Sequence, residues 1–358
     1  MSRNKEHELI INKIEESNFN CLFYVATGSG KTRILIESIK KLNPKSVLWT
    51  CATEKFRAQG LKEEFDKWEG DFSIIKPICW HSLGSCKEEF DLIVLDEIQM
   101  MTKRRFSYFK KHKPSHIIAC SGTESGDFDK KSMIDSLGIK KILQVGVDEA
   151  VEKGLISNYE VEIRYCELDN ITKKQIKPGF AVTDKQTYDW YTNKINELRE
   201  EGEWELHKRM SLARARFIYN CKSKLLPGLS IVRELRDKRT IIFSKSTDIA
   251  NQLSHNTFHT VMDKKLANEN YSNFNSYKES HISVVEAANT SLNFVDIEVV
   301  YIHQLDSNPV NFLQKQGRGL RIRENYKAKI IILCMKDTQD EVWVNKCIES
   351  LKNINHVE

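Results

Sequence analysis

Long apolar runs are missing from this sequence. None approaches the roughly 20 consecutive apolar residues that a membrane-spanning helix needs, and the first residues carry no basic-then-apolar leader. A hydrophobic share of 40% beside 29% charged residues is ordinary for a globular protein. We therefore expect a cytoplasmic protein that makes no contact with a membrane.

Cysteine patterns typical of metal sites are also missing. The nine cysteines form no C-x-x-C pair and have no histidine at zinc-finger spacing. Cys21, Cys51, Cys120 and Cys334 occur in apolar, strand-like runs, where thiols usually behave as small hydrophobic groups. The sequence predicts reduced cysteines and no structural metal.

A strong charge excess is absent as well. Lysine and arginine outnumber aspartate and glutamate by 55 to 50, which permits a basic groove but does not demonstrate nucleic-acid binding. The most basic stretch, residues 103–113, also contains Phe106, Tyr108 and Phe109. Such interleaving suits phosphate contact and stacking, but basic helix faces are usually just solvated. We favour a solvated helix whose aromatic side chains pack in the core.

The length and the apolar pattern predict two α/β domains. A chain of 358 residues is long for one hydrophobic core. Strand-like runs alternate with helical stretches, and several are apolar at successive positions, as in parallel strands buried on both faces. The expected strands are residues 22–25, 47–51, 74–79, 92–95, 117–120, 142–145, 240–244, 282–285, 297–301 and 329–334.

The middle of the chain has a different texture. A strand-like run at residues 161–168 is followed by charged amphipathic helices at 186–201 and 203–220. We predict one doubly wound domain over residues 1–147 and a second over 148–358, which contains a helical excursion at about residues 168–226.

The most informative segment is a glycine-rich turn between the run at residues 22–25 and a helical stretch at 32–42. In a strand–loop–helix setting, backbone N–H groups and a helix N-terminus bind phosphates. Lys31 can reach the β- and γ-phosphates, and Thr32 can ligate Mg²⁺. The predicted nucleotide-binding residues of this turn are Thr27, Gly28, Ser29, Gly30, Lys31 and Thr32.

Two carboxylates follow the apolar run at residues 92–95. Asp96 can hold Mg²⁺ through its water shell, and Glu97 can orient or deprotonate the attacking water. A glycine-rich turn and an acidic strand end in this order predict a site that hydrolyses a nucleoside triphosphate.

A third segment, residues 314–321, contains Gln314, Arg318 and Arg321. Guanidinium groups delivered to a γ-phosphate stabilise the charge of the transition state, although an arginine-rich turn alone is often only a surface feature. Together with the two earlier segments it resembles motif VI of superfamily 2 helicases, which reads Q-x-x-G-R-x-x-R. This resemblance implies two tandem RecA-like domains and catalytic roles for all three side chains.

Other segments resemble the family's motifs in the family's order. Residues 96–99 resemble motif II in its D-E-x-Q form, with Gln99 linking the γ-phosphate to motif VI. Residues 121–123 resemble motif III, which implies a coupling role for Ser121 and Thr123, although these residues could equally form a plain turn. Motifs Ia, Ib, IV and V imply nucleic-acid contacts by Thr53, Ser82, Ser244 and Thr290.

Departures from the family pattern set this chain apart. The family's adenine-reading glutamine upstream of the glycine-rich turn has no counterpart at residues 5–8, so base specificity stays open. Motif V has Thr290-Ser291 where the family usually has Glu-Gly. Residues 149–156 resemble the segment that leads into the second domain of the UvsW, XPB and RecG branch. These features suggest a small, divergent member, and they favour a phage origin and action in a prokaryotic or phage-infected cell.

The resemblance implies an ATP-dependent DNA helicase or branch-remodelling translocase. It would use ATP and Mg²⁺ and act as a monomer on single-stranded or branched DNA. An RNA helicase and an ATP-gated nucleic-acid clamp that does not unwind stay open as alternatives. We expect the excursion to select the substrate, and we expect most of its aromatic side chains Trp190, Tyr191 and Trp204 to be packed.

Overall fold

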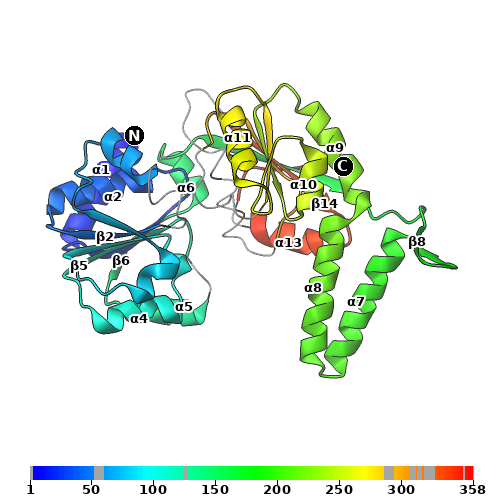
Figure 1. Cartoon of the computed structure of the whole chain (residues 1–358), viewed down its shortest axis with the longest axis horizontal. Helices are drawn as coiled ribbons and strands as arrows, with labels where there is room; N and C mark the ends of the chain where they lie inside the picture. Colours follow the sequence, from blue (N-terminus) through cyan, green and yellow to red (C-terminus); the bar gives the residue numbers. More distant parts are fainter. Residues whose placement is uncertain are drawn as a thin grey trace. The chain divides into compact units, whose positions relative to one another are not determined.

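The protein is described from a computed structural model that covers residues 3–51, 60–124, 127–285, 294–306, 312, 317, 327–349 and 351–357. Its tertiary contacts form two compact units, one built mainly from residues up to Asn158 and the other from Tyr159 onward. Both units are α/β structures built on a central sheet, as predicted (Figure 1). In the part of the chain that is described, no helix is both long and apolar enough to cross a membrane.

The first unit contains a six-stranded parallel sheet of order β3-β2-β4-β5-β1-β6. All six strands predicted in this half are confirmed to within two residues at each end. β1, β2, β4 and β5 are buried apolar runs, whereas β6 is largely exposed. Cys21, Cys51 and Cys120 are completely buried in this sheet. The strands are β1 (Asn20–Val25), β2 (Val47–Cys51), β3 (Ile75–Cys79), β4 (Leu92–Asp96), β5 (His116–Ser121) and β6 (Lys140–Val145).

Helices and short 3-10 turns connect these strands. The basic stretch after residue 102 forms α4, on which Tyr108 is buried with Phe106 and Phe109 packed against the same core cluster. The expected packing of these aromatic side chains is confirmed. Lys110 on this helix faces solvent, as both interpretations of the basic stretch require. The elements are α1 (Arg3–Glu16), α2 (Lys31–Leu42), α3 (Leu61–Lys67), η2 (Trp80–Ser85), η3 (Ile98–Met100), α4 (Lys103–Lys111), α5 (Phe128–Asp135) and α6 (Val147–Glu152).

The second unit contains a seven-stranded sheet of order β11-β12-β10-β13-β14-β7-β15. The predicted strands are present, whereas the two-residue β11 and the exposed β15 were not predicted, because neither has an apolar run. The strands are β7 (Asn158–Cys166), β10 (Thr240–Ser244), β11 (Thr257–Phe258), β12 (His281–Val285), β13 (Val299–Ile302), β14 (Lys327–Met335) and β15 (Ile354–Val357).

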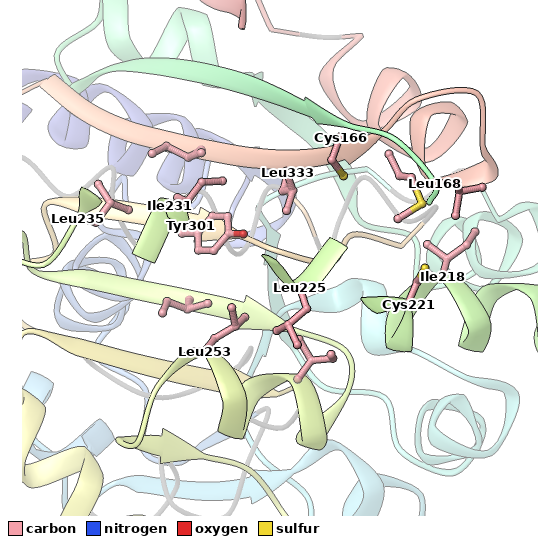
Figure 2. Packing of buried hydrophobic residues seen from close by; sticks show 14 of the residues in the cluster. Cys166, Leu168, Ile218, Cys221, Leu225, Ile231, Leu235, Leu253, Tyr301 and Leu333 are labelled. Carbon is pink, nitrogen blue, oxygen red and sulfur yellow. The ribbon is translucent and has the colours of Figure 1, made fainter. Parts of the chain in front are cut away.

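Helices α9 (Lys222–Glu234), α10 (Thr247–Leu253), α11 (Lys264–Asn275) and α13 (Gln339–Ile348) complete this unit. Figure 2 shows Ile231 of α9, and Leu235 just after this helix, in the main apolar cluster with Tyr301 of β13. A buried ion pair between Lys224 and Asp340 joins α9 to α13. Removing either partner would leave an uncompensated charge in the core, so this pair fixes how the two helices pack.

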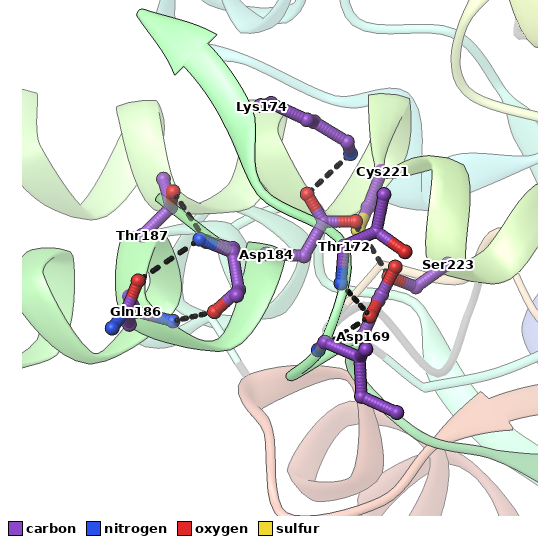
Figure 3. A network of polar contacts seen from close by, with 10 residues as sticks. Asp169, Thr172, Lys174, Asp184, Gln186, Thr187, Cys221 and Ser223 are labelled. Atoms are coloured by element: carbon purple, nitrogen blue, oxygen red, sulfur yellow. Dashed lines mark hydrogen bonds and ion pairs between the residues drawn. The ribbon is translucent and has the colours of Figure 1, made fainter. Parts of the chain in front are cut away.

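The predicted excursion is a helical hairpin of α7 (Asp184–Glu200) and α8 (Trp204–Asn220), preceded by an antiparallel strand pair that was not predicted, β8 (Lys174–Lys177) and β9 (Phe180–Val182). Figure 1 shows α7 and α8 side by side, extending away from the sheet of their own unit. At the base, Asp184 pairs with Lys174 and accepts hydrogen bonds from Ser223 and Cys221 (Figure 3). The outer part of the hairpin is therefore free of the sheet.

Two aromatic residues of this hairpin contradict our expectation of packing. Trp190 is 58% exposed and Trp204 is 65% exposed. Tyr191 is half-buried and contacts Phe217 across the hairpin at a ring-centroid distance of 6.0 Å. A two-helix hairpin buries only the faces that its helices turn toward each other, so tryptophans on the outer faces stay in solvent.

Candidate nucleotide-hydrolysis site

The glycine-rich turn joins β1 to α2 in the first unit. Gly28 (φ 91°) and Gly30 (φ 87°) both adopt left-handed backbone conformations that favour glycine. Gly30 also precedes α2 and supplies no side chain to cap the helix, so the first N–H groups of α2 can donate to a phosphate. The local geometry is that of a phosphate-binding loop.

Two side chains of α1 hold this loop from behind. Arg3 donates from Nη2 to the carbonyl oxygen of Gly28 at 2.9 Å, and His7 Nε2 lies 2.7 Å from the carbonyl oxygen of Ser29. Burial lowers the pKa of His7 to about 4, so the ring is neutral at pH 7 and donates its Nε2 proton. A Cβ atom on Gly30 would lie 2.9 Å from Cε1 of His7. Neither contact was predicted, because no sequence pattern connects Arg3 or His7 with the glycine-rich turn.

Replacing His7 with alanine should therefore weaken ATP binding more than turnover. We expect KM for ATP to rise about tenfold, the effect of losing one hydrogen bond that preorganises the loop, with kcat changed by less than about twofold. Glu8→Ala, on the exposed face of the same helix, is the matched control. Steady-state kinetics and calorimetry with a non-hydrolysable ATP analogue would measure both effects. An unchanged affinity in the His7 variant would contradict the assignment.

The loop contacts the segment that resembles motif III. A Cβ atom on Gly122 would lie 2.8 Å from Oγ1 of Thr27 and 3.7 Å from Nζ of Lys31. Ser121 donates from Oγ to the carbonyl of Thr123 at 2.8 Å and accepts from the Thr123 N–H at 3.1 Å. The two residues thus form a turn against the phosphate-binding loop. A movement of the loop would therefore displace this turn.

Asp96 ends β4 beside this loop. Burial and the neighbouring charge of Glu97 raise the pKa of Asp96, while the charge of Lys31 lowers it. The thiol of Cys120 on β5 donates to Oδ1 of Asp96 at 3.3 Å. A hydroxyl on Thr32 and a carboxylate on Asp96 are the hard oxygen ligands that Mg²⁺ prefers, and a bound cation would favour the ionised carboxylate. The ligand chemistry of these two residues suits Mg²⁺, and their role as its ligands stays a prediction.

Glu97 occupies an unusual backbone conformation. Its φ of 59° and ψ of 56° are left-handed, and the chain then enters η3. Gln99 donates from Nε2 to Oε2 of Glu97 at 2.6 Å, which orients the carboxylate. Its other amide atom, Oε1, is buried and has no hydrogen-bond partner among the residues described. The turn therefore holds one carboxylate in a fixed direction and keeps one acceptor available.

The remaining predicted site residues lie elsewhere. Ser82 is half-buried on η2, and Ser244 ends β10 with an exposed fraction of 2%. The structure thus brings motifs I, II and III together within the first unit. Five predicted residues lie outside the described part of the chain: Thr53, Thr290, Gln314, Arg318 and Arg321.

Two family models match this sequence in the order that the motifs predict. Residues 4–119 match "Type III restriction enzyme, res subunit", and residues 221–323 match "Helicase conserved C-terminal domain". The chain is a superfamily 2 helicase. The predicted family and the ATP-dependent enzyme class are thereby confirmed, while the UvsW-like branch and a phage origin stay predictions. No curated protein matches the sequence of this helicase.

Solved structures show the same fold. The Hef helicase domain of Pyrococcus furiosus is 15% identical, with a TM-score of 0.57, and the match covers 95% of this helicase and 96% of that chain. Dbp5 of S. cerevisiae, bound to RNA and ADP BeF3, is 11% identical, with a TM-score of 0.60 and coverage of 94% and 85%. The restriction-modification enzyme LlaBIII, bound to DNA, is 12% identical, with a TM-score of 0.61 and coverage of 99% and 31%. The predicted tandem RecA-like architecture is confirmed.

Proposed function

We propose that this helicase acts on DNA, as an ATP-dependent helicase or branch-remodelling translocase of the UvsW-like branch. The observation that carries the proposal is the D-E-x-Q turn, in which Gln99 aligns Glu97 beside the phosphate-binding loop. The D-E-x-Q form of motif II and residues 149–156 favour DNA over RNA. We further propose a cytoplasmic monomer whose functional domains are residues 1–147 and 148–358.

We propose that hydrolysis uses the phosphate-binding loop, the D-E-x-Q turn and the segment that resembles motif VI. The N–H groups of residues 28–32 and the ammonium of Lys31 would bind the phosphates of ATP, and Thr32 and Asp96 would hold Mg²⁺, which supplies positive charge at the phosphate oxygens. Glu97 would take the proton of the attacking water. Gln314, Arg318 and Arg321 are proposed to stabilise the charge that develops on the γ-phosphate.

Nucleic acid is proposed to contact Thr53, Ser82, Ser244 and Thr290 through its backbone. Contacts of this kind read phosphates and sugars, so binding should depend strongly on salt and weakly on sequence. Each cycle of ATP binding and hydrolysis would then move these contacts one step along the strand.

The hairpin is proposed to engage the branched or duplex part of the substrate. Trp204, Lys208, Leu212 and Arg216 are all exposed and recur every four residues along α8, which puts them on one face. In the described part of the chain, no ion pair joins Lys208 or Arg216 to a carboxylate. A face that alternates apolar and basic side chains suits stacking on bases and pairing with phosphates.

Variants of this face give a direct test of the hairpin. Trp204→Ala with Lys208→Ala should slow the remodelling of a synthetic DNA fork about tenfold or more, because stacking and phosphate contacts would be lost. Stimulation of ATPase activity by single-stranded DNA should persist. Trp190→Ala on α7, which also removes an exposed tryptophan, is the matched control.

Replacing only the outer part of the hairpin, residues 194–212, with a short linker keeps α9 and the Lys224–Asp340 pair. This variant should likewise leave DNA-stimulated ATPase measurable while removing strand displacement. A folded variant that still remodels forks at the full rate would show that the hairpin is not the element that opens the substrate. ATP-dependent binding without any strand displacement by the unaltered protein would instead favour the clamp alternative.

A further inference from the structure

The main-chain carbonyl of Asp96 has two side-chain partners from neighbouring strands and turns. The indole of Trp80, the first residue of η2, donates from Nε1 to this carbonyl oxygen at 2.7 Å. Thr50 of β2 places its hydroxyl 3.3 Å from the same oxygen. The backbone pairing of β2 with β4 ends at the pair Trp49–Val94. Beyond that pair, the carbonyl of Asp96 is hydrogen-bonded by the side chains of Trp80 and Thr50 instead.

This carbonyl belongs to the peptide group that sets the direction of Glu97. The peptide plane between residues 96 and 97 carries the oxygen of Asp96 and the nitrogen of Glu97, so its orientation determines φ at Glu97. That φ is 59°, a left-handed value that a glutamate rarely adopts unless its surroundings impose it. A donor that holds the oxygen in place therefore helps to impose the backbone conformation from which the Glu97 carboxylate points.

Trp80 is itself held firmly and lies in a candidate strand-binding turn. It is 1% exposed, and the same short turn carries Ser82, the predicted nucleic-acid contact. Gly84 of this turn approaches α4 so closely that a Cβ atom there would lie 2.4 Å from the carbonyl oxygen of Arg104. η2 is thus packed on one side against α4, and on its other side Trp80 is hydrogen-bonded to the main chain of Asp96, next to Glu97.

We propose that Trp80 is a positioning residue for Glu97 and mechanically links the strand-binding turn η2 to ATP hydrolysis. The link runs from the backbone of η2 through one indole N–H to the peptide group that orients the catalytic carboxylate. A strand bound at Ser82 would act on hydrolysis through this bond. The inference rests on the proposed function, in which Glu97 activates water and Ser82 contacts nucleic acid.

The test removes the N–H donor and keeps the ring. Trp80→Phe should lower kcat for ATP at saturating single-stranded DNA about tenfold, the effect of one hydrogen bond to a positioned group. KM for ATP and Kd for DNA should change by less than about twofold, because the indole is buried and bonds to the main chain of Asp96. Site-specific replacement of Trp80 by benzothienylalanine, which has sulfur in place of the N–H, should give the same loss with no change in ring size.

Trp49→Phe is the matched control. Trp49 is completely buried on β2, packs edge-on against Phe65 at a ring-centroid distance of 5.6 Å, and its Nε1 has no hydrogen-bond partner among the described residues. Trp49→Phe removes the same part of a buried indole ring but no hydrogen bond, so kcat should stay near the wild-type value.

Three results would overturn the inference: wild-type kcat in the benzothienylalanine protein, an equal loss in Trp49→Phe, or a loss confined to KM and Kd. Glu97→Gln, run in parallel, separates the two proposals. If Glu97→Gln keeps full activity, the role proposed for Glu97 fails whatever Trp80 does. If only Glu97→Gln is impaired, the role of Glu97 stands and the role of Trp80 fails.

Discussion

Replacing Lys31 with alanine is expected to abolish ATP turnover, with a loss of at least about 10³-fold. Lys31 begins α2, its Nζ lies 3.4 Å from the carbonyl of Val25, and its charge reaches Asp96. Arg3 bonds the loop through the carbonyl of Gly28, whereas Lys31 supplies a point charge suited to the β- and γ-phosphates. Steady-state phosphate release measures the loss.

The control for this variant lies on the same helix. Lys40→Ala removes an exposed lysine that pairs with Glu37, so turnover should stay at the wild-type value. Binding of nucleic acid without nucleotide should survive in both variants, since the contacts proposed for the strand do not involve α2. Substantial hydrolysis by Lys31→Ala would mean that the loop does not hold the reacting phosphates.

Glu97→Gln is expected to slow hydrolysis by ~10²-fold or more while ATP and Mg²⁺ still bind. Glutamine keeps the shape of the side chain and can still bond to Gln99, but it cannot accept the proton of the attacking water. The variant should therefore accumulate in an ATP-bound state that holds nucleic acid. Single-turnover hydrolysis and filter binding of labelled ATP would separate the chemical step from binding.

A matched control exists for the unusual backbone at this position. Glu69 also has a left-handed backbone, with φ of 53°, but is exposed and remote from the loop in the sequence. Glu69→Gln should leave hydrolysis unchanged. A Glu97→Gln protein that no longer binds nucleotide would assign Glu97 a structural role instead.

The strands and the hydrolytic segments were predictable because each is encoded locally. A parallel strand buried on both faces must be apolar at successive positions, as in β4 and β10, and a phosphate-binding turn must have glycine where φ is positive, as at Gly28 and Gly30. Both requirements restrict the residue types at neighbouring positions, so both can be recognised in the sequence. The two-residue β11 and the exposed β15 were not predicted, because neither is long and buried enough to require a run of apolar residues.

The supporting contacts of the site could not be predicted in the same way. His7 and Ser29 are 22 positions apart in the chain, and Trp80 and Asp96 are 16 apart. No spacing rule connects them, because the contacts exist only once α1 and η2 have packed on the sheet. Trp80 is buried in the core, and the sequence around it gives no sign that its indole nitrogen donates to the carbonyl of Asp96. The exposure of Trp190 and Trp204 was not predicted. Amphipathic spacing indicates that each helix buries one face, but it does not show which aromatic side chains lie on the faces that stay in solvent.

The most direct test of the central claim is steady-state ATP hydrolysis measured side by side with single-stranded DNA, duplex DNA, forked DNA and RNA. A DNA helicase or branch-remodelling translocase predicts hydrolysis that is slow alone and strongly stimulated by single-stranded or forked DNA, with the stimulation declining as salt rises. Stimulation by RNA alone, or a rate that no nucleic acid changes, would contradict the account.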